Sequence, residues 1–353
     1  MSGTASSPGI GSTLPMTQDS PSNRYARQIQ FAPIGAEGHA RIAKSRVAVL
    51  GCGALGTVAA EVLARAGVGG LVIVDRDVVE WTNLQRQALY TEQDAREGRS
   101  KADAACERLA AINGSIDIEP VVADVGSGNI RGILEGVDLV MDAADNFLLR
   151  FLLNDWSLAT GTPWVHGGCV GAVGQVRLFR GDGAPCFRCL VPEPPPASAV
   201  DTCDTAGVVG SATHVVASLQ ATEAIKWLSG NRDAVRSTLL SIDLWSNRIR
   251  ELKLGESISE QCVACANREY EFLDGDRAVQ SEAAAILCGR DAVQIHSSDT
   301  NAVDLPLMAK RWESVGRVQA NPFFVRLFPD DSHSLTLFRD GRVVVTGTSE
   351  ISV

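Results

Sequence analysis

The sequence has 353 residues, a length that predicts one large domain together with a smaller unit. Its 45% hydrophobic and 21% charged residues are typical of a globular protein, and no stretch approaches the roughly 20 apolar residues of a membrane helix, so a membrane span is excluded. A formal net charge of −10 without a local basic stripe would repel a polyphosphate backbone, so nucleic acid is not an expected partner.

The cysteines indicate the compartment. There are nine of them in a large chain, an odd number, and the N-terminus has neither the basic nor the apolar region of a signal peptide. These features favour reduced thiols over a disulfide framework. We therefore expect a cytoplasmic protein.

The first half of the chain predicts an α/β fold. Ser, Thr, Gly and Pro dominate residues 1–23, which we expect to form a disordered tail. Apolar runs and helical patterns then alternate, and they predict strands at 47–50, 71–74 and 137–141 and helices at 57–66 and 101–112. This alternation favours a Rossmann-like, mixed and mostly parallel sheet with helices on both faces.

The second half predicts the end of this domain and a separate small unit. A strand is expected at 173–179 and a long helix at 210–228, and we place the domain between residues 24 and 275. Residues 276–353 are expected to form an α+β appendage. Its predicted elements are strands at 292–295, 323–328, 335–338 and 343–346, the last two joined in a hairpin at Asp340-Gly341, and a helix at 305–314.

A glycine-rich loop follows the first predicted strand. Gly51, Gly53 and Gly56 would permit a tight turn and let phosphate oxygens approach the N-terminus of the next helix. Asp75 ends the second strand, where a carboxylate would accept hydrogen bonds from a ribose. By itself this motif is typical of a nicotinamide or flavin oxidoreductase.

Further motifs in a fixed order narrow this interpretation. The chain carries, in order, Arg24-Tyr25-Ala26-Arg27-Gln28, Asp75-Arg76-Asp77, Thr82-Asn83-Leu84-Gln85-Arg86-Gln87, Lys101 and Asp145-Asn146. From Arg24 to about Cys265 it closely resembles the ThiF and MoeB branch of the ubiquitin-activating enzyme superfamily. Members of that family use ATP and Mg²⁺ to adenylylate the C-terminal glycine of a ubiquitin-like sulfur-carrier protein, usually as homodimers.

The resemblance implies a role for each of these residues. Arg86 and Lys101 would contact the phosphates, Asp145 would hold Mg²⁺, and Arg27 would reach the nucleotide of the partner protomer. The residues implied to bind the nucleotide are Gly51, Gly53, Gly56, Asp75, Asp77, Thr82, Asn83, Arg86, Lys101, Asp145 and Asn146. Such cations are needed because a C-terminal carboxylate is already ionised at neutral pH and must approach an anionic triphosphate.

Each of these residues also has a simpler interpretation. Arg86 and Lys101 could be surface charges, Asp145 could cap a helix, and Asp77 could belong only to its loop. The joint order of the motifs favours the functional interpretation for the first three, and Asp77 stays open between the two.

Four cysteines form two pairs with metal-ligand spacing. Cys186 and Cys189 form one Cys-x-x-Cys pair, and Cys262 and Cys265 form the other. Two such pairs predict a tetrahedral four-thiolate Zn²⁺ site, and because all four positions are filled the metal would be structural. The alternative is two redox-active dithiols, but neither pair begins a helix after a strand.

Cys203 is a candidate nucleophile on a predicted loop. In the family, a cysteine at this place can capture the activated carrier as a thioester or acyl-disulfide, although some members do without it. Cys169 is expected to be a small buried residue instead.

The sequence therefore predicts a homodimeric enzyme that adenylylates a carrier ending in Gly-Gly, with a separate protein as sulfur donor because no rhodanese-like domain follows. Three alternatives stay open. They are a nicotinamide-dependent oxidoreductase, an enzyme that adenylylates a small molecule or a tRNA base, and a zinc-stabilised binding module without catalysis.

Overall fold

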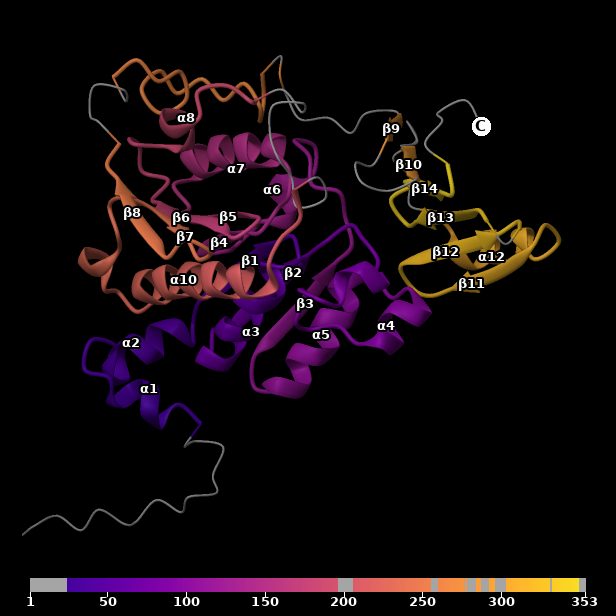
Figure 1. Cartoon of the computed structure of the whole chain (residues 1–353), viewed down its shortest axis with the longest axis horizontal. Coiled ribbons are helices and arrows are strands. Elements are labelled where there is room, and N and C mark those ends of the chain that lie inside the picture. The colour runs from indigo at the N-terminus through magenta and orange to yellow at the C-terminus, as the bar shows by residue number, and fades with distance from the viewer. Residues whose placement is uncertain are drawn as a thin grey trace, which may run out of the picture.

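The computed structural model describes residues 24–195, 206–254, 260–275, 277, 284–286, 292–295, 303–330 and 332–348. Cys203 and the N-terminal segment 1–23 lie outside these residues. The described chain contains an eight-stranded sheet with helices on both faces and a six-stranded sheet beside it (Figure 1). None of the described helices is both long and apolar enough to cross a membrane.

The large sheet is mixed and mostly parallel, as predicted. Its strand order is β3-β2-β1-β4-β5-β6-β7-β8, with β1 to β5 paired in parallel and the remaining pairs antiparallel. The strands are β1 (Arg46–Leu50), β2 (Gly70–Val74), β3 (Asp117–Val121), β4 (Leu139–Asp142), β5 (Trp164–Val170), β6 (Val173–Phe179), β7 (Leu239–Asp243) and β8 (Arg248–Leu252).

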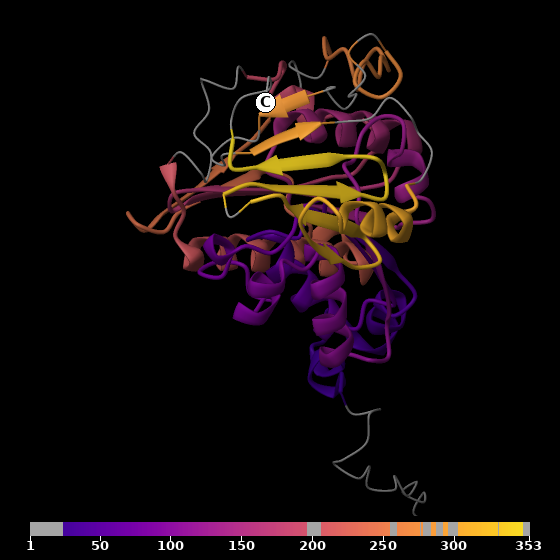
Figure 2. The same cartoon turned by 90° about the vertical axis from the view of Figure 1, so that its right-hand side faces the viewer.

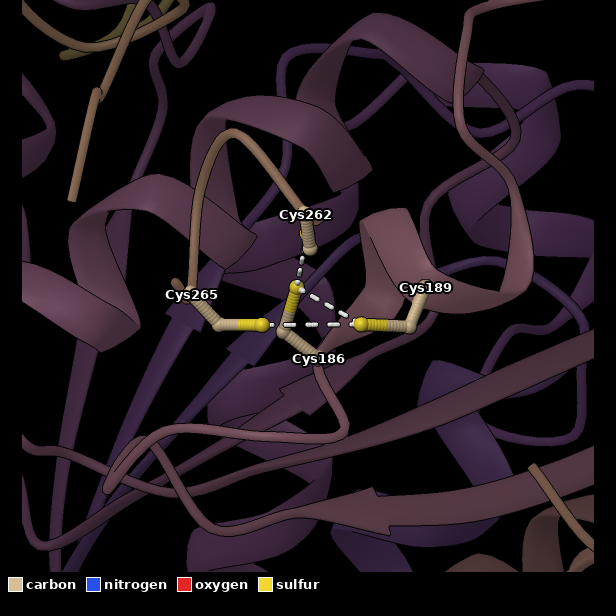
Figure 3. A group of neighbouring side chains, drawn as sticks. All are labelled: Cys186, Cys189, Cys262 and Cys265. Atoms are coloured by element: carbon tan, nitrogen blue, oxygen red, sulfur yellow. Dashed lines mark hydrogen bonds between the residues drawn. The ribbon is translucent and has the colours of Figure 1, made fainter. Parts of the chain in front are cut away.

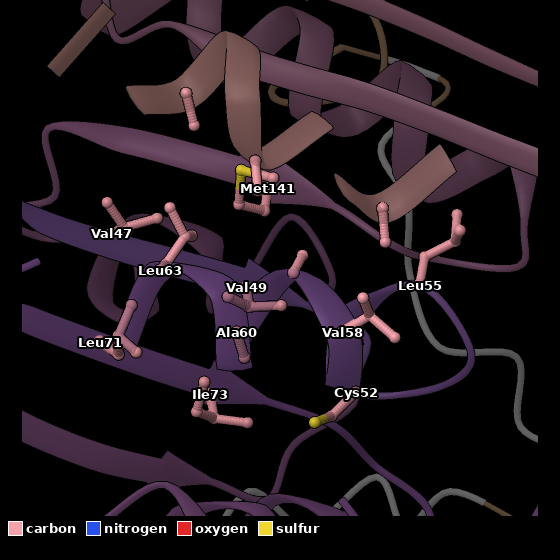
Figure 4. Close-up of a cluster of buried hydrophobic side chains, with 14 of the residues drawn as sticks. Val47, Val49, Cys52, Leu55, Val58, Ala60, Leu63, Leu71, Ile73 and Met141 are labelled. Carbon is pink, nitrogen blue, oxygen red and sulfur yellow. The ribbon is translucent and has the colours of Figure 1, made fainter. Parts of the chain in front are cut away.

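Apolar side chains on both faces of this sheet make its core. One face packs against α3 (Gly56–Ala66), α5 (Lys101–Ile112) and α10 (Gly210–Leu228), and Figure 4 shows part of that cluster. The other face packs against α6 (Ile130–Ile133) and α7 (Phe147–Thr160). The shorter helical segments are α1 (Ala26–Gln30), α2 (Gly35–Ile42), η2 (Trp81–Asn83), α4 (Glu92–Glu97), α8 (Phe187–Leu190) and η4 (Arg232–Ala234).

Helix α7 is not among the predicted helices. Its residues 150–157 are all buried, so the helix presents no continuous polar stripe to solvent. Its polar residues Arg150, Asn154 and Ser157 recur at helical spacing, but they belong to a buried face and not to a solvent-facing one, so the pattern differs from that of a surface helix.

The C-terminal unit is an antiparallel sheet with one helix, which agrees with the predicted α+β appendage. Its strand order is β11-β12-β13-β14-β10-β9, and helix α12 (Leu305–Trp312) packs on it through Leu305, Val325 and Leu337 (Figure 2). Strands β13 and β14 form the predicted hairpin. The strands are β9 (Ala284–Ile286), β10 (Ala292–Ile295), β11 (Arg317–Ala320), β12 (Phe324–Phe328), β13 (Ser334–Phe338) and β14 (Val343–Thr346).

Candidate functional site

The carboxyl ends of three neighbouring parallel strands bring most of the predicted residues to one edge of the large sheet. Leu50 at the end of β1 is in register with Val74 of β2 and with Asp142 of β4. The glycine loop, the segment from Asp75 and the segment that leads to Asp145 therefore begin side by side. Ligands of open α/β sheets bind at such an edge.

The glycine loop lies directly against the segment that follows β4. Gly51 has φ +86°, and a Cβ placed there would come within 2.6 Å of the carbonyl oxygen of Ala143. A Cβ at Gly56, where α3 begins, would overlap the carbonyl oxygen of Gly51. Only glycine fits at these two positions, so the loop can pack tightly against the segment after β4 and turn directly into the N-terminus of α3, where a phosphate would bind.

Asp75, Asp77 and Lys101 form a charged group beside this loop. The two carboxylate oxygens of Asp75 accept hydrogen bonds from the backbone N–H groups of Cys52 (2.6 Å) and Asp77 (2.7 Å). Lys101 is buried, and its Nζ lies 3.2 Å from Oδ2 of Asp77. Burial raises the pKa of Asp75, although the Lys101 ammonium opposes this shift. Lys101 is thus an enclosed cation at the strand edge and not a solvated surface charge.

The Thr82–Arg86 segment places a guanidinium group on the same side. Nη1 of Arg86 donates to the carbonyl oxygen of Thr82 at 2.8 Å, the hydrogen bond that its guanidinium group makes within the part of the chain that the structure describes. Asn83 is buried, and its Oδ1 accepts from the N–H of Glu80 at 3.0 Å. The Asn83 side chain therefore shapes the turn that presents Arg86.

Asn146, and not the neighbouring Asp145, caps the N-terminus of helix α7. Oδ1 of Asn146 accepts from the N–H of Leu149 at 2.8 Å, so Asn146 is the N-cap of α7. The alternative that Asp145 caps this helix is thereby wrong. Asp145 is exposed, and its charge is one of those that, with Asp124 and Asp77, raise the pKa of Arg76 against the opposing effect of burial.

Arg27 lies far from its own glycine loop. It is on α1, where Gln28 donates to the carbonyl oxygen of Ala66 at 2.9 Å, and just before this helix Arg24 donates to the carbonyl oxygen of Ile112 at 2.8 Å. Ala66 ends α3, and the glycine loop begins this helix of 11 residues, or about 16 Å. Arg27 therefore sits at the opposite end of the sheet from the remaining predicted residues.

A buried ionic cluster supports the β4 edge, and no role is predicted for its members from the sequence. Oδ2 of Asp142 lies 3.1 Å from Nε of Arg150 and 2.8 Å from Nδ1 of His166. Nη2 of Arg150 also donates to the carbonyl oxygen of Ala144 at 2.7 Å. The cluster holds the backbone that leads into Asp145. Only the pairing of β4 with β5 brings His166 to Asp142, so no local pattern in the sequence indicates it.

The two Cys-x-x-Cys pairs come together in space (Figure 3). The Sγ separations are 3.9 Å for Cys186 and Cys189, 3.6 Å for Cys186 and Cys262, and 3.5 Å for Cys189 and Cys265. Four sulfurs at about 2.3 Å from a tetrahedral Zn²⁺ would be about 3.8 Å apart, so the arrangement fits this ion. The hydrogen bond between Cys186 and Cys189 lowers the pKa of Cys189 and raises that of Cys186, and burial raises the pKa of Cys265.

Comparison with known proteins identifies the family. Residues 25–264 match the family described as "ThiF family". The chain belongs to the ThiF family. It is 41% identical over 330 residues to the Sulfur carrier protein ThiS adenylyltransferase of Bacillus subtilis, covering 93% of this chain and 96% of that protein.

Two further comparisons extend this result. The ThiF-family chain is 38% identical to the Adenylyltransferase and sulfurtransferase MOCS3 of Anopheles gambiae over 77% of its own length, and it spans 63% of that relative. The crystal structure of E. coli MccB with AMPCPP and SeMet MccA has the same fold, with a TM-score of 0.61 at 21% identity over 71% of this chain and 76% of that chain. Membership of the family replaces the oxidoreductase interpretation of the glycine loop.

The two remaining cysteine predictions have different outcomes in this ThiF-family chain. Cys169 lies on β5 and is buried, as expected. Cys203 lies outside the described residues, so its place relative to the strand edge is not given by the structure.

Proposed function

We propose that this chain is an ATP-dependent adenylyltransferase that activates the C-terminal carboxylate of a ubiquitin-like sulfur-carrier protein. One observation carries the proposal. The glycine loop, Lys101 and Asp145 meet at one strand edge, in a chain that matches a ThiS adenylyltransferase over 96% of that protein. A zinc-stabilised module without catalysis would have no need of an enclosed ammonium group there.

The residues of the chain would act mainly through charge and position. The backbone of the glycine loop and Asp75 would hold the phosphates and ribose, while Lys101 and Arg86 would stabilise the charge that develops as pyrophosphate leaves. No general base is needed, because the attacking carboxylate is ionised at neutral pH. Mg²⁺, with Asp145 as its ligand, would neutralise phosphate charge when bound, and exposed Asp145 fits this ligand chemistry.

We infer that the body of the carrier docks beside the edge strand β8. Trp245, Ile249 and Leu252 are large apolar side chains with exposed fractions of 82%, 68% and 53%, and β8 is the last strand in the order of its sheet. Trp245 precedes β8, and Ile249 and Leu252 leave opposite faces of this strand. The free edge of β8 can pair with a strand of a second protein, which would cover part of these apolar side chains. The C-terminal tail of the carrier could then extend from β8 towards the carboxyl ends of β1, β2 and β4. Because glycine has no side chain, a Gly-Gly tail would not clash with the protein along this path.

The oligomeric state, the sulfur donor and the location of the protein are also part of the proposed function. Action as a homodimer would bring Arg27 of the partner to the site, which its remote position in its own protomer supports. A separate sulfur donor fits the close match to a relative named for adenylylation alone. A cytoplasmic location fits the described cysteines, none of which forms a disulfide.

The proposal is tested by ATP–pyrophosphate exchange with a panel of carrier proteins that end in Gly-Gly. At least one carrier should stimulate exchange, and Asp145→Ala should reduce it by more than about 100-fold because the metal would lose its ligand, with the fold kept. Deletion of the final glycine from the carrier is the matched control. Exchange stimulated by a small molecule or a tRNA and by no carrier would contradict the proposal.

A further inference from the structure

The C-terminal unit borders the proposed nucleotide site. A cavity of about 790 Å³ is lined on one side by Asp77, Asn83 and Arg86, which belong to that site. Its other side is formed by residues of strands β12, β13 and β14. The C-terminal unit therefore lies close enough to affect how a nucleotide is held.

Arg342 of the C-terminal unit reaches into the large domain. Its side chain is 1% exposed, and its Nη2 donates to the carbonyl oxygen of Arg76 at 2.6 Å. Two contacts within the C-terminal unit hold the guanidinium group in place. Its Cζ lies 3.8 Å from the ring centre of Phe338, and its Nη1 donates to Oε1 of Gln294 at 3.3 Å. The hydrogen bond to Arg76 is thus made by a donor with a fixed orientation.

The peptide group between Arg76 and Asp77 is held at both ends. Its carbonyl oxygen accepts from Arg342, and its N–H donates to Oδ1 of Asp75 at 2.7 Å. A charged donor on the carbonyl oxygen polarises the peptide group, which strengthens the hydrogen bond made by its N–H. Arg342 therefore acts on Asp75 through a single peptide group, although the two residues belong to different units.

Asp75 is the carboxylate that is proposed to accept hydrogen bonds from the ribose. Two backbone N–H groups orient it, those of Asp77 and of Cys52, the latter at 2.6 Å. Burial raises the pKa of Asp75, and these N–H groups are among the groups that oppose the rise. A rotation of the peptide between Arg76 and Asp77 would remove one of the two donors, and the carboxylate would lose its fixed orientation.

A second contact between the units fixes the same segment. Nε2 of Gln294 on β10 lies 3.2 Å from Oδ2 of Asp124, and Nη1 of Arg76 donates to Oδ1 of this aspartate at 3.1 Å. One carboxylate group thus joins the side chain of Arg76 to the C-terminal unit, while Arg342 binds its backbone. Both attachments restrict the segment that follows β2.

We propose that Arg342 is a positioning residue for nucleotide binding, and that it acts by holding the peptide between Arg76 and Asp77 in the orientation that aligns Asp75 with the ribose hydroxyls. The C-terminal unit is then part of the nucleotide site and not a plain appendage. This inference rests on the proposed function, which supplies the nucleotide. The positive charge of Arg342 acts on any triphosphate alike, whereas the orientation of Asp75 matters only to a ligand with ribose hydroxyls.

The test compares two ligands of the full chain by isothermal titration calorimetry with Mg²⁺. They are ATP and 2′,3′-dideoxy-ATP, which has the same base and phosphates but no ribose hydroxyls. The wild type should bind ATP at least about tenfold more tightly, because a hydrogen bond to a charged group has this effect. Arg342→Met keeps an apolar side chain against Phe338 and removes the donors, so this ratio of affinities should fall below about threefold. The lost charge weakens both ligands equally and cancels from the ratio.

Two further variants complete the design. Arg339→Met is the matched control, because this exposed arginine donates to the carbonyl oxygen of Pro322 within its own unit, at 3.1 Å. Its ratio should equal that of the wild type. If Arg342→Met does not fold, Gln294→Leu, which removes the side chain that holds Arg342 and contacts Asp124, should lower the ratio instead.

The outcomes separate this inference from the proposed function. A ratio in Arg342→Met equal to that of the wild type would overturn the inference, even if both nucleotides bound more weakly, because the variant would have lost charge or stability alone. Equal binding of the two nucleotides to the wild type would also overturn it, since Asp75 would then not hold the ribose. A wild type that binds neither nucleotide would overturn the proposed function together with the inference.

Discussion

Asp142 is a buried carboxylate that contacts three segments of the chain. Its partners Arg150 and His166 come from α7 and β5, and its Oδ1 also accepts from the N–H of Ala144 at 3.1 Å. Burial alone would raise the pKa of Asp142, but Arg150 and His166 outweigh this effect and lower it. The carboxylate is thus charged in the folded protein and keeps the approach to Asp145 in place.

We predict that substitutions of Asp142 and Asp145, which are three residues apart, affect different properties. The change at Asp142 should lower stability, and the change at Asp145 should lower activity alone. Asp142→Asn should lower the free energy of unfolding by about 3–5 kcal/mol, because the buried Arg150 would lose its counter-charge. Asp145→Asn should change it by less than about 0.5 kcal/mol and still lose pyrophosphate exchange, because Asp145 is exposed. Urea unfolding of both variants checks this, and equal destabilisation would contradict it.

Asp155 predicts a pH dependence of stability with the opposite sign to that of a paired carboxylate. Burial raises the pKa of Asp155 to about 6, although the N–H of Phe272 and the amide of Asn154 oppose this. Between the unfolded pKa of about 3.9 and 6, the folded chain holds a proton that the unfolded chain has lost. The proton on Asp155 therefore stabilises the folded chain fully below about pH 4. This stabilisation falls as the pH rises to about 6, and above that pH it is absent.

The measurement compares wild type with Asp155→Asn, which cannot titrate. From pH 4 to 7, the unfolding free energy of the wild type should fall relative to the variant by up to about 3 kcal/mol. Any pH dependence of metal binding is common to both proteins and cancels. A constant difference between the two across this range would show that Asp155 has an ordinary pKa.

Among the secondary-structure elements, α7 links the strand edge to the four-cysteine cluster. Asn146 caps its first turn, and further along Oδ1 of Asn154 accepts from the N–H of Phe187 at 2.8 Å. Oδ2 of Asp155 accepts from the N–H of Phe272 at 2.9 Å. The two segments that carry the cysteine pairs are therefore attached to one helix, and a bound metal would fix them to each other as well.

We predict one Zn²⁺ per chain and a structural role for it. Cys262→Ser should release the metal and lower the melting temperature by about 5–10 °C, because two segments far apart in sequence would lose their cross-link. Cys106→Ser, the same change at a buried cysteine outside the cluster, should keep the metal. Elemental analysis and calorimetry measure both effects, and a freshly purified, reduced protein without zinc would refute the site.

At the scale of the whole molecule, the fold places Arg27 away from the nucleotide site that this residue is proposed to complete. Arg27 is held at the end of α3 opposite to the glycine loop, and α1 is fixed there by contacts to Ala66 and Ile112. A second protomer could place this arginine at the strand edge, whereas the chain's own fold does not. A dimer would then have two sites, each built from both protomers.

Mixed dimers test this arrangement. When Arg27→Ala and Asp145→Ala chains are combined in equal amounts, random pairing should leave about a quarter of all sites intact, because half of the dimers are mixed and each has one complete site. Either variant alone should be inactive. Native mass spectrometry would confirm that mixed dimers form, and no recovery of exchange in their presence would exclude action between protomers.

The sequence by itself determined those features that depend on neighbours along the chain. Gly51 and Gly56 stand where a turn admits no side chain, Cys186 and Cys189 have the spacing of metal ligands, and the alternation of strands and helices indicated the parallel sheet. These inferences succeeded because turn geometry, ligand spacing and periodicity act over a few residues.

Only the tertiary structure decided the features that depend on pairing between distant segments. The register of β4 with β5 brings His166 to Asp142, the packing of α7 buries the polar side chains of that helix, and Arg342 of the C-terminal unit donates to the carbonyl oxygen of Arg76. Each of these unites residues that are not neighbours in sequence or removes a polar face by packing. Such contacts arise from the summed free energy of burial over the whole chain, which no local pattern contains.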